Sequence, residues 1–232
     1  KTGEGNIDRT YTVTYTKNPT PVIDKGTITV TVHDVTTDAD LPQYGKQSGE
    51  KDVGTKFDFD KTSTIIELTN KGYKVINPDV VIPTEITKGS QTVTIYVEHN
   101  TTPINPDKPG KPGEPINPND PEGPKYPEGT DKNSLIKTGT QTVHYEGAGD
   151  LTPADNTTTV EFTHSMVIDN VTGKIITDNG WTPSSQNYKS IVTPTIEGYT
   201  ADVKVAGGET VTIDPKTGEG NIDRTYTVTY TK

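Results

Sequence analysis

The sequence contains no cysteine, one methionine, one tryptophan and three phenylalanines among its 232 residues. The absence of cysteine excludes a disulfide framework, thiolate metal sites and cysteine nucleophiles. Hydrophobic residues make up only 28% of the chain, which is too little for the large apolar core of an α/β enzyme. These absences favour small cores and argue against catalysis in a deep apolar pocket.

Positive charge is also scarce, because arginine occurs only as Arg9 and Arg224 and the formal net charge is −10. No basic stripe is present to neutralise phosphates, so nucleic acid is excluded as a partner. An acidic surface is repelled by anionic lipid, and no run of 18 apolar residues predicts a membrane span. We therefore expect neither nucleic-acid binding nor membrane insertion.

Threonine is abundant instead, with 43 residues, almost one in five. Its β-branched side chain favours strands, and its hydroxyl allows one face of a sheet to stay in water. Threonines alternate with Ile28, Val30 and Val32, and the second half of the chain alternates in the same way at Val160 and Phe162. This period of two predicts half-buried β-strands.

A duplication divides the chain. Residues 1–17 read KTGEGNIDRTYTVTYTK, and residues 216–232 repeat them letter for letter. The offset of 215 residues predicts a tandem array in which residues 1–17 are the tail of the preceding repeat. As strand material severed from its own domain, this first copy is expected to be unpaired or to pair with a neighbouring molecule.

A proline-rich segment, residues 103–130, separates two predicted domains at 18–102 and 131–232. Its nine prolines recur at every third position from Pro103 to Pro127. Polyproline II has three residues per turn, so the rings are expected to form one ridge of a semi-stiff linker. A floppy linker is the alternative, because glycines interrupt the segment.

The first domain carries one helix candidate, Lys61 to Lys71. Thr64 and Glu67 have the spacing of a capping box, and Gly72 is a typical helix terminator. In the second domain, a short helix or an irregular crossover is expected over residues 184–191. The fold class is therefore α+β but mostly β, with two β-grasp-like domains in an elongated arrangement. A β-sandwich is the alternative for the second domain.

The second half of the chain resembles the mucus-binding repeats of Lactobacillus surface adhesins. The matching pieces, which cover residues 138–232 well and 18–102 more loosely, are Gln141–Tyr145, Val160–Thr163, Val171–Lys174, Trp181-Thr182, Pro194 and Gly198–Asp202. The resemblance implies ubiquitin-like β-grasp domains that bind mucin glycoproteins and, in some repeats, immunoglobulins. It also implies an extracellular protein anchored to the cell wall of a Gram-positive bacterium.

Three aromatic residues are candidate binding residues: Trp181, Tyr188 and Tyr199. Their rings could stack on a sugar or anchor a protein partner, although small cores also need such side chains. Asp34, Asp38 and Asp40 crowd one predicted loop and could offer oxygens to a structural calcium ion, but they lack the EF-hand pattern. A solvated turn is the simpler interpretation, and no other metal or cofactor is expected.

No nucleophile elbow, phosphate loop or zinc-helix motif is present, so the chain is not expected to be an enzyme. The main hypothesis is a repeat that binds mucin weakly and gains avidity in tandem. The alternative is a passive stalk that projects other domains from the cell wall.

Overall fold

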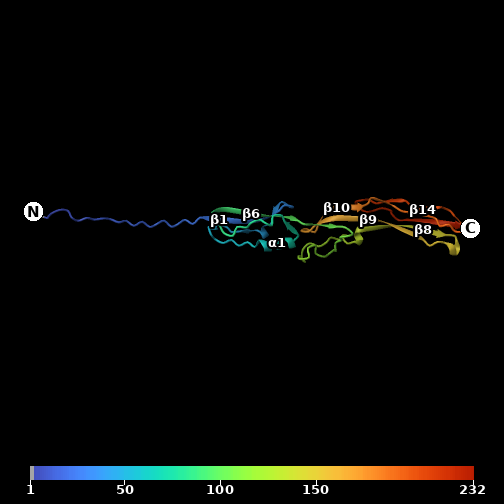
Figure 1. Ribbon diagram of the computed structural model, residues 1–232, viewed down its shortest axis with the longest axis horizontal. Coiled ribbons are helices and arrows are strands. Elements are labelled where there is room, and N and C mark those ends of the chain that lie inside the picture. Colours follow the sequence, from blue (N-terminus) through green and yellow to red (C-terminus); the bar gives the residue numbers. More distant parts are fainter. Residues whose placement is uncertain (1–2) are drawn as a thin grey trace.

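The computed structural model describes residues 3–232, and Figure 1 shows an elongated molecule with two folded units end to end. Both units are built mainly from β-strands, which confirms the predicted fold class. Residues 3–24 precede the first strand, form no strand and are exposed throughout. Within this chain residues 3–17 pair with no strand, and the pairing of the first copy with a neighbouring molecule stays a prediction.

The first unit is a six-stranded sheet with the order β2-β1-β6-β5, in which β3 and β4 also pair with β1. Its strands are β1 (Lys25–Asp34), β2 (Ala39–Asp40), β3 (Lys46–Gln47), β4 (Lys51–Asp52), β5 (Tyr73–Val75) and β6 (Gly89–His99). The central strands β1 and β6 are parallel, and their outer neighbours are antiparallel. The predicted alternation of β1 is confirmed, because Ile28, Val30 and Val32 are buried.

One helix, α1 (Lys61–Asn70), covers this sheet and is preceded by the 3₁₀ turn η1 (Pro42–Tyr44). The predicted helix is confirmed, but the predicted capping box is wrong. The carboxylate of Asp60 accepts a hydrogen bond from the Ser63 amide at 2.9 Å, so the helix is already capped one turn before Thr64. Leu68 is the buried residue of α1, and Gly72 follows the helix with a φ of 95°.

The second unit contains a sheet with the order β10-β9-β8-β16-β13, in which β7 also pairs with β9. Its strands are β7 (Thr101–Ile104), β8 (Ile136–Glu146), β9 (Asn156–Asp169), β10 (Ile175–Thr182), β13 (Thr200–Ala201) and β16 (Arg224–Thr231). The 3₁₀ turns η2 (Asn133–Leu135) and η3 (Gly149–Leu151) precede and follow β8. Strands β8 and β16 are parallel, like β1 and β6 in the first unit.

Four short strands take the place of a helix in the second unit. They form two pairs: β11 (Ser185–Asn187) with β15 (Thr210–Thr212), and β12 (Ser190–Val192) with β14 (Val205–Gly207). Ala206 packs on Val143 and Val228, and Val211 packs on Phe162, so the short strands cover one face of the sheet. Residues 184–191 therefore contain β11 and most of β12, and neither the expected short helix nor the irregular crossover describes them.

Both units share a strand order, with a parallel central pair and antiparallel neighbours. The more specific assignment to ubiquitin-like β-grasp domains stays a prediction.

The proline-rich segment is folded, so the predicted polyproline spacer is wrong. It begins as β7, which pairs with β9, and then turns back on itself with bridges between Asn105 and Lys108 and between Pro115 and Lys125. Gly113 permits the reversal with a φ of 83°. The segment also carries apolar residues between its prolines, and their burial outweighs the preference for an extended rod. They pack in one core cluster: Ile104, Ile116 and Tyr126, against Leu135, Met166 and Ile168.

The two units meet in a joint built from both of them. The Asn170 amide donates to the Asn100 carbonyl at 2.9 Å, and Val171 packs against the core of the first unit. Lys71 at the end of α1 forms an ion pair with the buried Asp120 of the proline-rich segment at 3.0 Å. Backbone pairing, apolar packing and an ion pair thus connect the units directly.

A buried histidine lies at the centre of this joint. His99 Nε2 is 2.6 Å from Asp34 Oδ2 in the first unit, and His99 Nδ1 is 2.6 Å from Asp169 Oδ2 in the second. Burial lowers the pKa of His99, but the hydrogen bonds to Asp169 and Asp34 outweigh it, so the pKa is raised above 6.5. The His99 ring therefore bridges a carboxylate from each unit.

Candidate functional site

Tyr188 lies in the interior of the second unit and is only 4% exposed. Its ring packs with Phe162 and Val211, and its hydroxyl donates to the Ile222 carbonyl at 2.7 Å. A partner cannot reach this side chain, which corrects the prediction that Tyr188 is a binding residue. The residue type alone had left open whether Tyr188 binds a partner or fills the core.

Trp181 is half-buried and holds a loop against β10. Its indole stacks on the His164 ring, with centroids 5.0 Å apart and an interplanar angle of 24°. Gly218 lies so close that a Cβ there would be 2.6 Å from the indole nitrogen. The Trp181 side chain therefore has a structural role, and its binding role stays a prediction.

A hollow of about 380 Å³ is lined by residues 178–180, which immediately precede Trp181 in the sequence, and by Pro215 and Lys216. Asp178 also contacts His164, with 2.6 Å between Asp178 Oδ1 and His164 Nε2. This hydrogen bond lowers the pKa of Asp178 and keeps its carboxylate ionised. The hollow thus offers a carboxylate, an amide and an ammonium group.

Tyr199 lines a larger groove, of about 390 Å³, near the end of the second unit. We call this the Tyr199 groove; it is lined by residues 192–196, 199–201, 203–204 and 230. Its wall is fixed by Tyr230, whose hydroxyl donates to the Pro194 carbonyl at 2.7 Å. Tyr199 is half-buried, so part of its ring faces the groove.

Valines extend the apolar character of this groove to the surface. Val192 of β12 and Val205 of β14 are directly opposite each other, and both are exposed. Val203, two residues before Val205, is exposed as well. The sequence did carry a signal for this face. In SIV (190–192) two apolar residues are adjacent, so on a strand one of them has to point outward.

Gln141 holds the short strands in place beneath the groove. It is fully buried; its Nε2 donates to the Lys189 carbonyl at 2.9 Å, and its Oε1 accepts from the Gly208 amide at 2.9 Å. These two partners immediately precede β12 and follow β14. Gln141 therefore fixes one end of the β12–β14 pair, where Ser190 is opposite Gly207, to β8.

The three aspartates proposed for calcium do not converge. Asp34 points inward to His99, whereas Asp38 and Asp40 contact His33 at 3.0 and 2.8 Å. Adjacent residues of a strand face opposite sides, so His33 and Asp34 direct these groups apart. The calcium hypothesis is thus wrong for this set, and residues 3–232 contain no group of three or more metal-ligating side chains.

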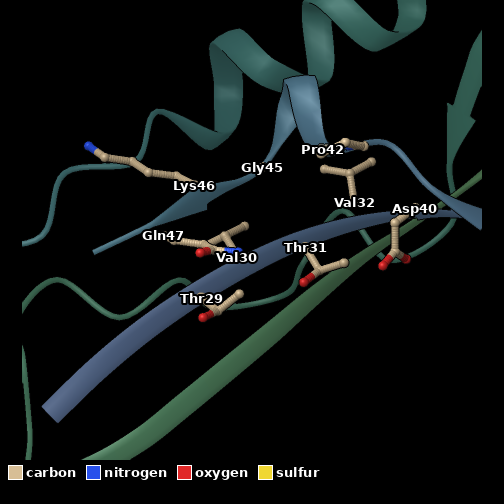
Figure 2. A pocket seen from close by; sticks show the side chains of 9 residues that line it. All are labelled: Thr29, Val30, Thr31, Val32, Asp40, Pro42, Gly45, Lys46 and Gln47. Carbon is tan, nitrogen blue, oxygen red and sulfur yellow. The ribbon is translucent and has the colours of Figure 1, made fainter. Parts of the chain in front are cut away.

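The first unit has a smaller hollow, of about 170 Å³, on the edge of β1 (Figure 2). It lies beside the segment that connects β2 to β3, two strands that both pair with β1. Gly45 in this segment is so close to β1 that a Cβ there would be 2.5 Å from the Val30 carbonyl oxygen. Figure 2 shows Val30 and Val32 on the side of the helix and Thr29 and Thr31 on the other. This hollow is less than half the size of the Tyr199 groove.

Comparisons with known families agree with the division into two units. Residues 26–99 match the mucin binding domain family, and residues 130–232 match the Muc B2-like domain family. Between them, the two matches cover most of the chain. The chain belongs to the mucus-binding repeats. No curated protein matches it.

The chain is also similar to solved structures. The structure of Mub-RV is 25% identical, with a TM-score of 0.56, and the alignment covers 88% of this chain and 97% of that one. A type 2 repeat of the mucus binding protein MUB from Lactobacillus reuteri is also 25% identical, covering 89% and 98% with a TM-score of 0.42. The mucin-binding domain of a Streptococcus pneumoniae protein is 24% identical, covering 41% and 89% with a TM-score of 0.33.

These families are binding domains rather than enzymes. No helix among the described residues is long and apolar enough to cross a membrane.

Proposed function

We propose that the chain is an adhesin repeat that binds mucin glycoproteins, and that the Tyr199 groove is a principal contact surface. The observation that carries the proposal is that residues 26–99 match the mucin binding domain family, while the Tyr199 groove lies in the unit that matches the Muc B2-like domain family. The structures of relatives are described as mucus-binding or mucin-binding, which supports the same ligand class.

The chemistry of the groove suits a glycosylated polypeptide. Tyr199 and Val192 in the groove, together with the exposed Val205 opposite Val192, offer apolar surface for the C–H faces of sugars or for peptide side chains. Thr193 and Thr200 add hydroxyl groups, and Lys204 adds a cation for acidic substituents. The groove is open and shallow, so each contact is weak, and affinity comes from several repeats acting together.

The duplicated sequence supports a tandem array on a bacterial surface. Concatenated repeats raise the apparent affinity by about 10²-fold or more when several can bind one mucin molecule. Immunoglobulin binding, which the sequence resemblance implied, would use a free sheet edge such as β10. We place the repeat in an extracellular protein anchored to the cell wall.

The test measures retention of the chain on immobilised mucin after two substitutions, Val192→Thr in the groove and Val205→Thr at the strand position opposite it. Threonine keeps the β-branched shape but removes the apolar contact, so we expect at least a severalfold loss of binding. Val81→Thr is the matched control, because Val81 is an equally exposed valine of the first unit. If the protein with Val192→Thr and Val205→Thr were retained as well as the Val81→Thr control, the assignment of the groove would be contradicted. No binding by any of the proteins, including the unsubstituted chain and its concatemers, would favour the stalk.

A further inference from the structure

A β-bulge shapes the hollow beside β10. We call it the Asp178 hollow; it is lined by residues 178–180, Pro215 and Lys216. The pairing of β10 with β9 skips one residue between Asp178 and Gly180, so Asn179 is the extra residue of the bulge. In a regular strand, the adjacent side chains of Asp178 and Asn179 would face opposite sides of the sheet. The bulge lets both of them line the same hollow.

The opposite wall is a turn, residues 214–219, whose position is fixed. The Asp214 carboxylate accepts a hydrogen bond from the Lys216 amide at 2.8 Å. The Pro215 carbonyl accepts one from the Trp181 amide at 2.7 Å, which fastens the turn to β10. Both walls are thus in place before a ligand arrives, so a ligand does not bear the entropic cost of ordering them.

The Asp178 carboxylate has one oxygen in use and one free. Oδ1 accepts a hydrogen bond from the Gly180 amide at 2.9 Å and lies 2.6 Å from His164 Nε2. Within residues 3–232, no donor lies within hydrogen-bond distance of Oδ2. These contacts hold the carboxylate in one orientation and leave Oδ2 as an acceptor for a ligand.

An amide oxygen and an ammonium group are free as well. Asn179 Nδ2 donates to Ser165 Oγ at 3.1 Å, so its amide oxygen remains an acceptor. Lys216 uses its backbone amide in the turn, and its ammonium group contacts no acceptor in the part of the chain that the structure describes. The hollow therefore combines two free acceptors with one free donor group.

We propose that the Asp178 hollow binds a neutral sugar through its hydroxyl groups. A hydroxyl group both donates and accepts hydrogen bonds. Neighbouring hydroxyls of one sugar can therefore donate to the free oxygens of Asp178 and Asn179 and accept from Lys216. The carboxylate and the ammonium group cancel in charge, so neither an anion nor a cation is favoured over a neutral ligand. The volume of about 380 Å³ is at the lower end of the range of about 300–1,000 Å³ for small-molecule sites.

This sugar site is separate from the Tyr199 groove, with which it shares no lining residue. It goes beyond the proposed contact surface and does not depend on it, because free sugars can be tested without mucin. If the chain does bind mucin, the hollow gives the second unit another point of attachment to the same glycoprotein, which raises the apparent affinity.

The experiment follows the amide NMR signals of the full chain while galactose, glucose, mannose or N-acetylgalactosamine is added. We expect at least one of these neutral sugars to shift the signals of residues 178–180 and Lys216 to saturation, with a dissociation constant of the order of millimolar. Asp178→Asn keeps the size of the side chain and the acceptor for Gly180, but it replaces the free acceptor by a donor. Binding should therefore weaken by about tenfold.

Lys216→Met covers the case in which Asp178→Asn disturbs the bulge, because it removes only the ammonium group. It should weaken binding severalfold. Asp155→Asn is the matched control and should bind like the unsubstituted chain. The Asp155 side chain is 51% exposed, against 53% for Asp178, and it also contacts a histidine, His144, at 2.7 Å.

Charged sugars provide the comparison for the ligand class. N-acetylneuraminic acid, an anion, and glucosamine, a cation, should each bind more weakly than the best neutral sugar. The proposal is overturned if none of the four neutral sugars shifts these signals, or if a charged sugar binds most tightly. It is also overturned if Asp178→Asn or Lys216→Met binds sugar as tightly as the Asp155→Asn control.

Discussion

The two units share a strand order but cover their sheets differently. In the first unit, helix α1 lies on the sheet and directs Leu68 into the core. In the second unit, Ala206 of β14, Val211 of β15 and Tyr188, between β11 and β12, fill the core in the same way. On α1 the only exposed large apolar residue is Ile66, whereas the β12–β14 pair presents both Val192 and Val205 to solvent. The replacement of a helix by short strands therefore creates the exposed apolar groove.

The comparison implies that the cover of the first unit depends on a single anchor. Leu68→Ala should destabilise that unit by about 2–5 kcal/mol, because it removes a fully buried side chain and leaves a cavity. Denaturant unfolding of the variant measures this loss. Ile66→Ala on the same helix is the control, with an expected change within about 0.5 kcal/mol, because Ile66 is 56% exposed. Similar losses for both variants would contradict the single-anchor account.

The cover of the second unit depends on polar anchoring instead. Gln141→Ala leaves the Gly208 amide and the Lys189 carbonyl without their partner, which should cost about 1–3 kcal/mol. Mucin binding should fall as well, because the β12–β14 pair is no longer fixed. Gln186→Ala removes one hydrogen bond, to Glu161, and should have a smaller effect on both. If Gln141→Ala left binding and amide protection of β12 unchanged, the anchoring role would be excluded.

The joint between the units should respond to pH. The folded-state pKa of His99 is raised, so its stabilising contribution is complete below the unfolded value of 6.5 and is lost as pH rises through the raised pKa. The groups that face His99 are Asp34, Asp169 and the ring of Tyr73, 5.3 Å away.

We therefore expect the melting temperature to fall between pH 6 and pH 9, and this fall to be smaller in His99→Gln. His144→Gln is the control, because His144 is an exposed histidine of the second unit. A fall of the same size in His99→Gln as in the unsubstituted chain would exclude His99 as its source.

Sequence reasoning succeeded where a local pattern determined the structure. The alternation at residues 28–32 predicted β1, and Gly72 predicted the end of α1. It failed where tertiary packing outweighed local preference. The proline spacing indicated an extended rod, but Ile104 and Ile116 bury against the second sheet and fold the segment back.

The candidate site shows the same limit. Trp181, Tyr188 and Tyr199 were chosen by residue type, and type alone cannot separate a core ring from a surface ring. Only the three-dimensional structure shows that Tyr188 is buried and that Tyr199 lines a groove with Val192 of β12 and with Val203.

The most direct test of the account is hydrogen exchange of the whole chain with and without a soluble mucin glycopeptide. Slower exchange in residues 189–207, with no change in residues 61–75, is the predicted result, because the contact surface lies on the short-strand cover of the second unit. Protection confined to α1 and β5 would contradict it and would place mucin recognition on the first unit.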